Sequence, residues 1–253
     1  MAVPTPGATL AQASDHARGL MLAGGAVLLI SFDALLVRLA DAPHWDVVFW
    51  RGTLIALTLA AWMLVSGQRL HLPPRRRDRW LIGLSVVMLS GNTTLFVLSV
   101  TYTAAANTVV FLAASPFFAA LFSALFLRER VPLRTWVAIA AAMAGVIVVF
   151  GGGMRGGTGL GDFFAMTMAV TVWAHLTILR RFPAVPRLPL ICLSGVLAAL
   201  TAVAFANPLA LSAESYAVIA LMGVVQMPLA TVMLAVATRY LPSPEVSLAL
   251  LVE

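Results

Sequence analysis

The chain has 253 residues, of which 61% are hydrophobic and only 10% are charged. A soluble domain carries roughly 25% charged residues to cover its surface, so this composition excludes a water-soluble globule. The net charge of +6 comes from sixteen arginines and no lysine. The arginines lie in loops between long apolar runs, which indicates membrane topology and argues against a nucleic-acid partner.

Apolar runs long enough to cross a bilayer follow one another along the chain. Residues 1–18 precede them and are predicted to be a disordered cytoplasmic tail, because they are polar and without periodicity. The predicted spans cover 19–40, 45–66, 79–100, 104–127, 133–150, 161–180, 188–206 and 214–239, and a ninth begins at 243. The predicted fold is an all-α polytopic membrane protein with eight full spans, whose short connections make successive helices antiparallel neighbours.

The arginines of the loops are distributed unevenly between the two membrane sides. Thirteen fall in one set of alternate loops, whereas the other set holds only Arg38 and Arg155, beside Asp41, Asp46, Asp162 and Glu214. Because basic loops stay in the cytoplasm, the N-terminus is predicted to be cytoplasmic.

The segment 151–160 is rich in glycine and falls on the opposite, periplasmic side. It lacks the Gly-Lys-Ser/Thr ending of a phosphate-binding loop and is predicted to be a linker between two halves of the protein. The single cysteine, Cys192, excludes an intrachain disulfide.

The stretch from 102 to 131 carries the most distinctive pattern. Tyr102 is followed by small residues and Asn107, Pro116 interrupts the apolar run, and Arg128-Glu129-Arg130 ends it. A related opening recurs at 239–248.

With two further matches at 49–51 and 161–181, these motifs resemble the EamA-type family of the drug/metabolite transporter superfamily. The resemblance implies two inverted five-helix repeats, here 19–150 and 161–253, the second of which would be truncated at Glu253 inside a ninth helix. It also implies a secondary transporter, most simply an exporter, of small organic solutes such as amino acids, metabolites or drug-like compounds.

Polar side chains within the spans are candidates for substrate binding or gating, because burying them in a bilayer is costly. Asp33 and Arg51 lie about equally deep, roughly 9 Å from the same surface, and could form an ion pair that is either scaffold or gate. With Asn107 they would make an outer polar cluster. His175 and Glu245 would make an inner cluster, related to the first by inverted symmetry.

Three further candidates, Asn92, Gln226 and Trp173, could line a midplane cavity. For the two amides an interhelical hydrogen bond is an equal alternative, and for the tryptophan ordinary packing is another. Proton coupling, to which facilitation and exchange are alternatives, would need one of four side chains: Asp33, His175, Glu245 or Glu253.

The expected partners are a small-molecule substrate, the lipid bilayer and, in a coupled mechanism, protons. No cofactor or metal is expected, and substrate identity and oligomeric state stay open. One rival is a membrane-embedded enzyme, although the histidines at 16, 44, 71 and 175 lack metal-site spacing. The other is a non-transporting assembly or sensor subunit with a dry, packed interior.

Overall fold

The structure is a computed structural model that describes residues 6–67, 70–104, 107–108 and 159–240, with isolated positions between 111 and 144. Every regular element among these residues is a helix. The spans expected at 104–127 and 133–150, the linker and the start of the ninth span lie outside the described residues.

Four helices cover the first three predicted spans, because the first span begins earlier than predicted and is interrupted at Phe32. They are α1 (Pro6–Ser31), α2 (Asp33–Leu39), α3 (His44–Ser66) and α4 (Arg76–Tyr102). Helix α1 begins within the segment for which the sequence predicts an irregular tail. Proline is favoured at the first position of a helix, and the alanines, leucine and glutamine that follow are good helix formers.

The second group begins with α8 (Gly159–Arg181) and α9 (Arg187–Ala202). The predicted span 214–239 is divided into α10 (Ala213–Ala220), the π-helix η3 (Leu221–Gln226) and α11 (Met227–Tyr240). Within the described ranges, five helical stretches are long and apolar enough to cross a membrane, and α9 is a shorter apolar helix. These six stretches correspond to six of the eight predicted spans.

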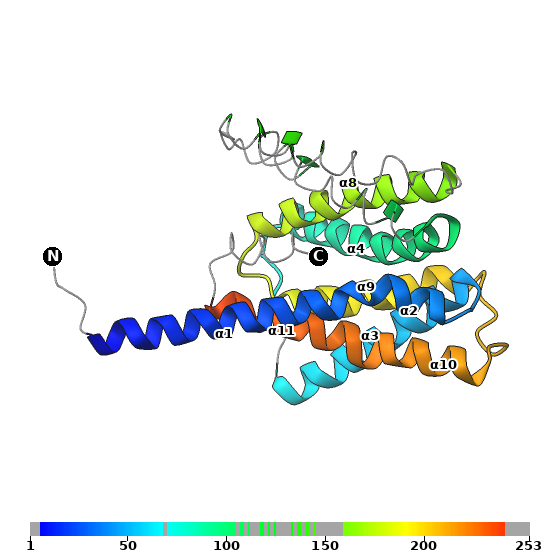
Figure 1. Cartoon of the computed structure of the whole chain (residues 1–253), viewed down its shortest axis with the longest axis horizontal. Helices are drawn as coiled ribbons and strands as arrows, with labels where there is room; N and C mark the ends of the chain where they lie inside the picture. The colour runs from blue at the N-terminus through cyan, green and yellow to red at the C-terminus, as the bar shows by residue number, and fades with distance from the viewer. Residues whose placement is uncertain are drawn as a thin grey trace.

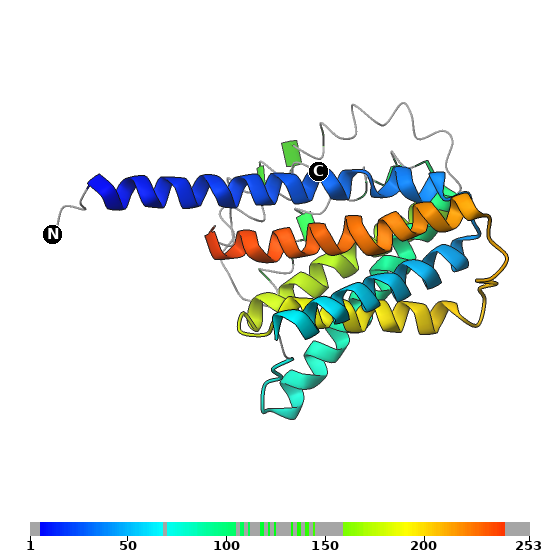
Figure 2. The same cartoon turned by 90° about the horizontal axis from the view of Figure 1, so that it is seen from below.

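The helices form a bundle in which distant parts of the sequence lie side by side (Figures 1 and 2). Helix α3 packs mainly against α9, α4 against α8, and α1 against α11. We call the end where α4 and α9 begin the arginine-rich end, and the end where α3 and α8 begin the acidic end. The connection between α9 and α10 closes the acidic end, at the right of Figure 1.

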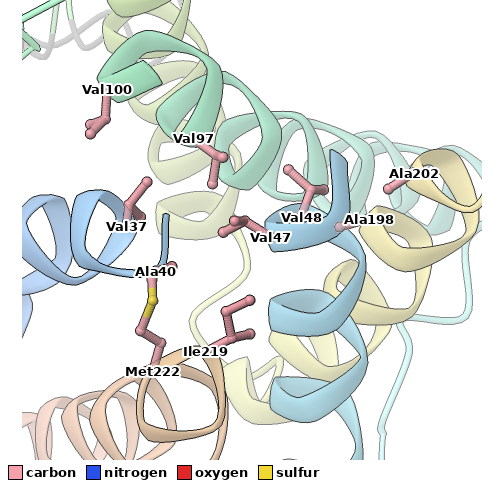
Figure 3. Close-up of a cluster of buried hydrophobic side chains, with 10 residues drawn as sticks. All are labelled: Val37, Ala40, Val47, Val48, Val97, Val100, Ala198, Ala202, Ile219 and Met222. Carbon is pink, nitrogen blue, oxygen red and sulfur yellow. The ribbon is translucent and has the colours of Figure 1, made fainter. Parts of the chain in front are cut away.

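The main apolar core lies in the half of the bundle nearer the acidic end (Figure 3). Its members come from α2, α3, α4, α9, α10 and η3: Val37, Ala40, Val47, Val48, Val97, Val100, Ala198, Ala202, Ile219 and Met222. Large apolar side chains such as Leu64, Val65 and Phe163 are instead exposed on the outside of the bundle. This outward apolar surface is what a lipid environment requires.

Candidate functional site

A buried ion pair joins α2 to α3. Arg51 Nη2 donates to Asp33 Oδ2 at 2.7 Å, and the two side chains are only 4% and 5% exposed. Asp33 opens α2, directly after the break in helical geometry at Phe32. The structure thus contains the ion pair that the equal depths of these two residues predict.

Two further side chains, Phe96 and Gln226, lie next to this ion pair. The Arg51 guanidinium lies over the ring of Phe96 on α4, 5.4 Å from its centroid. Gln226, the last residue of η3, donates from Nε2 to the Leu29 carbonyl at 2.7 Å, close to the break between α1 and α2. Because π-helical turns recur at functional sites, their presence beside a buried ion pair makes this junction the first candidate site.

Several polar atoms of this ion-pair cluster, which comprises Asp33, Arg51, Phe96 and Gln226, are buried without a hydrogen-bond partner. They are Asp33 Oδ1, Arg51 Nε and Nη1, and Gln226 Oε1. Leaving a buried donor or acceptor unsatisfied costs about 1–3 kcal/mol, and more for a charged group. Structural support alone does not explain why these atoms are buried without partners. Contact with water or with a polar ligand would explain it.

A second set of polar contacts runs along the α4–α8 interface. Ser85 Oγ lies 2.7 Å from His175 Nδ1, Thr171 Oγ1 donates to Asn92 Oδ1, and Thr103 Oγ1 donates to Asp162 Oδ1 at 2.9 Å. We call these three pairs the polar ladder. Ser85, Asn92 and His175 are buried, and Asn92 Nδ2 has no hydrogen-bond partner.

Asn107 adds a further hydrogen bond to the polar ladder at the acidic end. Its Nδ2 donates to Thr103 Oγ1 at 3.0 Å, and its side chain is buried. Helix α4 ends at Tyr102, and Thr103 is extended, so Asn107 starts a new turn at the acidic end. The expected place of Asn107 beside Asp33 and Arg51 stays a prediction.

The remaining candidates are placed as follows. Asn92 and Gln226 both make interhelical hydrogen bonds, one of the two roles left open for them. Trp173 lies half-buried on α8, between Thr171 and His175. Glu245 and Glu253 fall outside the described residues, so the expected pairing of His175 with Glu245 stays a prediction.

Sequence reasoning missed the hydroxyl partners in the ladder, although the sequence contains a signal for them. Ser85, Asn92 and Ser99 are spaced by seven residues and are all buried on α4. On α8, Thr171 and His175 are spaced by four. Polar residues at such spacings share one helix face, so the two stripes could have been matched.

Replacing Ser85→Ala should destabilise the protein by about 1 kcal/mol, because it removes one interhelical hydrogen bond to His175. The Ser85 carbonyl, 3.0 Å from the same nitrogen, remains as its partner. Unfolding titrations in detergent measure the effect. The matched control is Ser31→Ala, whose hydroxyl bonds only within its own helix, to the Val27 carbonyl. Equal effects of the two substitutions would contradict a role for the ladder in stability.

Comparison with known proteins shows the family to which the chain belongs. A model of the EamA-like transporter family matches residues 17–151, slightly more than half of the sequence. One solved crystal structure is similar with a TM-score of 0.62 and 22% sequence identity, covering 92% of this chain and 88% of its own. That likeness shows a shared fold. No curated protein matches the chain.

Proposed function

Because the chain belongs to the EamA-like transporter family, we propose that it is a secondary transporter of small organic solutes. The proposed substrates are amino acids, other metabolites or drug-like compounds, exported across the bacterial cytoplasmic membrane. In this proposal the N-terminus is cytoplasmic, and the arginine-rich end faces the cytoplasm.

The observation that carries the proposal is the ion-pair cluster with its unpartnered atoms. Donors on Arg51 and acceptors on Asp33 and Gln226 lack hydrogen-bond partners inside an apolar bundle. Ionisable groups inside a membrane are expensive and usually mark a substrate or ion pathway. A polar solute held between α2, α3 and η3 would supply the missing partners, which makes the cluster a proposed substrate contact or gate.

Contacts at the acidic end support a closed outer gate. Arg38 Nη2 donates to the Thr103 carbonyl at 2.9 Å, and Asp46 Oδ1 accepts from the backbone N–H of Asn207 at 2.6 Å. Together with the Thr103–Asp162 bond, they link α2, α3, α4, α8 and the connection after α9. The apolar core of Figure 3 lies at this end of the bundle. Alternating access would require this seal to open while the arginine-rich end closes.

Helix pairing supports two inverted repeats, 19–150 and 161–253. The first, second and third spans pack against the eighth, seventh and sixth, respectively. If the two repeats are related by symmetry, the first span corresponds to the sixth, the second to the seventh and the third to the eighth. This correspondence converts the contact between the first and eighth spans into the contact between the sixth and third spans. It leaves the second–seventh pair unchanged, as a two-fold axis in the membrane plane would.

Energy coupling is the finer part of the proposal. Asp33 on α2 and His175 on α8 are both buried and titratable. Among the described residues, these two are therefore proposed to carry protons. Glu245 and Glu253 complete the proposed set. A facilitated or exchange mechanism would leave all four in fixed protonation states.

Expression of the protein should lower the cellular accumulation of at least one solute in a panel of amino acids, their toxic analogues and drug-like compounds. Flux of that solute in liposomes, with and without an imposed pH gradient, then separates proton coupling from facilitation. Empty liposomes and liposomes with the Asp33→Asn/Arg51→Met variant are the controls. If no member of the panel is exported from cells or moved in liposomes, the proposed solute classes are wrong.

A further inference from the structure

A surface hollow lies along α4 at the arginine-rich end, far along the helix from the polar ladder's acidic-end contacts. It is an open hollow of about 600 Å³, and its described lining residues all belong to α4: Arg76, Arg79, Trp80, Gly83, Leu84 and Val87. Neither the ion-pair cluster nor the polar ladder uses any of them.

The lining residues form one stripe on the helix surface. Arg76, Trp80, Gly83 and Val87 are separated by three or four residues and therefore share a face. Trp80 is 68% exposed and Val87 55% exposed. A Cβ atom added at Gly83 would meet nothing within 4 Å, so the glycine leaves a gap between the tryptophan and the valine.

The stripe changes from charged to apolar along α4. The two arginines lie at the start of α4, and neither guanidinium group has a hydrogen bond or an ion pair among the described residues. Tryptophan is typical of the headgroup level. From Arg76 to Val87 the helix rises about 16 Å, which is close to half the thickness of a bilayer's hydrocarbon core.

We propose that this stripe binds an anionic phospholipid. The phosphate lies between the guanidinium groups of Arg76 and Arg79, because arginine presents several donors in a geometry that matches phosphate oxygens. Trp80 packs against the glycerol region, and one acyl chain occupies the gap at Gly83 and runs past Leu84 to Val87.

Charge and position together favour a lipid over a soluble anion. A free phosphate would need only the two arginines, whereas the hollow continues along the apolar side chains of a helix long and apolar enough to cross a membrane. Arginine clusters beside a membrane span attract anionic lipids in general, so a bound lipid must be distinguished from such diffuse attraction. The neighbours Arg75 and Arg77 do not line the hollow and provide that distinction.

The test measures the binding of phosphatidylglycerol to the purified protein in neutral detergent, by native mass spectrometry and by the shift in unfolding temperature. Phosphatidylcholine and inorganic phosphate are the other probes. The variants are Arg76→Gln/Arg79→Gln, the matched Arg75→Gln/Arg77→Gln, and Gly83→Leu, which fills the gap and leaves every charge in place.

The expected result is that phosphatidylglycerol binds and stabilises the unmodified protein and the Arg75/Arg77 variant. Binding to the Arg76/Arg79 variant should be about thirtyfold weaker, and Gly83→Leu should also lose it. Equal losses in the two double variants would show diffuse attraction only and overturn the proposal. Stabilisation by inorganic phosphate equal to that by the lipid would overturn it too, and so would unchanged binding to Gly83→Leu. None of these readouts depends on transport.

Discussion

Replacing Arg51→Met should destabilise the protein by about 3–5 kcal/mol, because it leaves the Asp33 carboxylate buried without its counter-charge. Methionine keeps the unbranched apolar stem of the side chain but lacks the guanidinium that lies over Phe96. Unfolding titrations in detergent measure the loss. Arg38→Met is the control, since Arg38 is exposed and donates only to backbone carbonyls, and we expect about 1 kcal/mol there.

The double variant Asp33→Asn/Arg51→Met removes both charges and should recover most of that stability, because replacing a whole buried ion pair is often close to neutral. A double-mutant cycle then gives the coupling energy between the two residues. If the double variant is as unstable as Arg51→Met alone, the loss arises from packing and not from the unpaired charge.

Transport by the same double variant separates scaffold from gate. A scaffold needs only stability, so a refolded, stable double variant would transport normally. The proposed substrate contact or gate needs the charged groups themselves, and we expect flux in liposomes to fall at least tenfold. A stable double variant with unchanged flux would contradict the proposed role of the ion-pair cluster.

The contrast between the ion pair and Asn107 shows what the sequence could determine. A carboxylate and a guanidinium in apolar spans have few ways to avoid a large burial cost, so equal depth was enough to pair Asp33 with Arg51. A neutral amide can be satisfied by any nearby hydroxyl or carbonyl. For Asn107 the partner depended on the end of α4 at Tyr102 and on the extended Thr103, a local event that the apolar pattern does not encode.

The positions of the spans can be predicted from the sequence more easily than the contacts between them. Hydropathy located α3, α4 and α8 to within a few residues, because the bilayer imposes length and apolarity on each helix separately. The π-helix η3 leaves the apolar pattern of the span unchanged, so nothing in hydropathy marks it. Predicting the hydroxyl partners in the ladder requires knowing how α4 and α8 are rotated relative to each other. The only indication of that rotation in the sequence is the polar stripe of α4, whose members are spaced by seven residues.

Replacing Gly52→Ala should destabilise the protein by about 1–3 kcal/mol, because α3 and α9 cross there backbone to backbone. A Cβ atom at Gly52 would lie 2.7 Å from the Gly195 carbonyl oxygen and 3.0 Å from the Ala199 nitrogen, neither of which can move without displacing a helix. The control is Gly24→Ala on α1, where a Cβ would meet nothing within 4 Å. There the higher helix propensity of alanine should stabilise the protein by up to about 1 kcal/mol.

The same crossing makes a sharper prediction about symmetry. A Cβ atom at Gly195 would also lie 2.7 Å from the carbonyl oxygen of Gly52, and each glycine is followed four residues later by an alanine that contacts the other. Such a reciprocal contact is what a two-fold axis through the α3–α9 crossing produces. Gly195→Ala should therefore match Gly52→Ala to within about 0.5 kcal/mol. Because a Cβ atom at either glycine already forces the helices apart, the double variant should lose clearly less stability than the sum of the losses of the two single variants. Unequal single losses or full additivity would contradict a symmetric crossing.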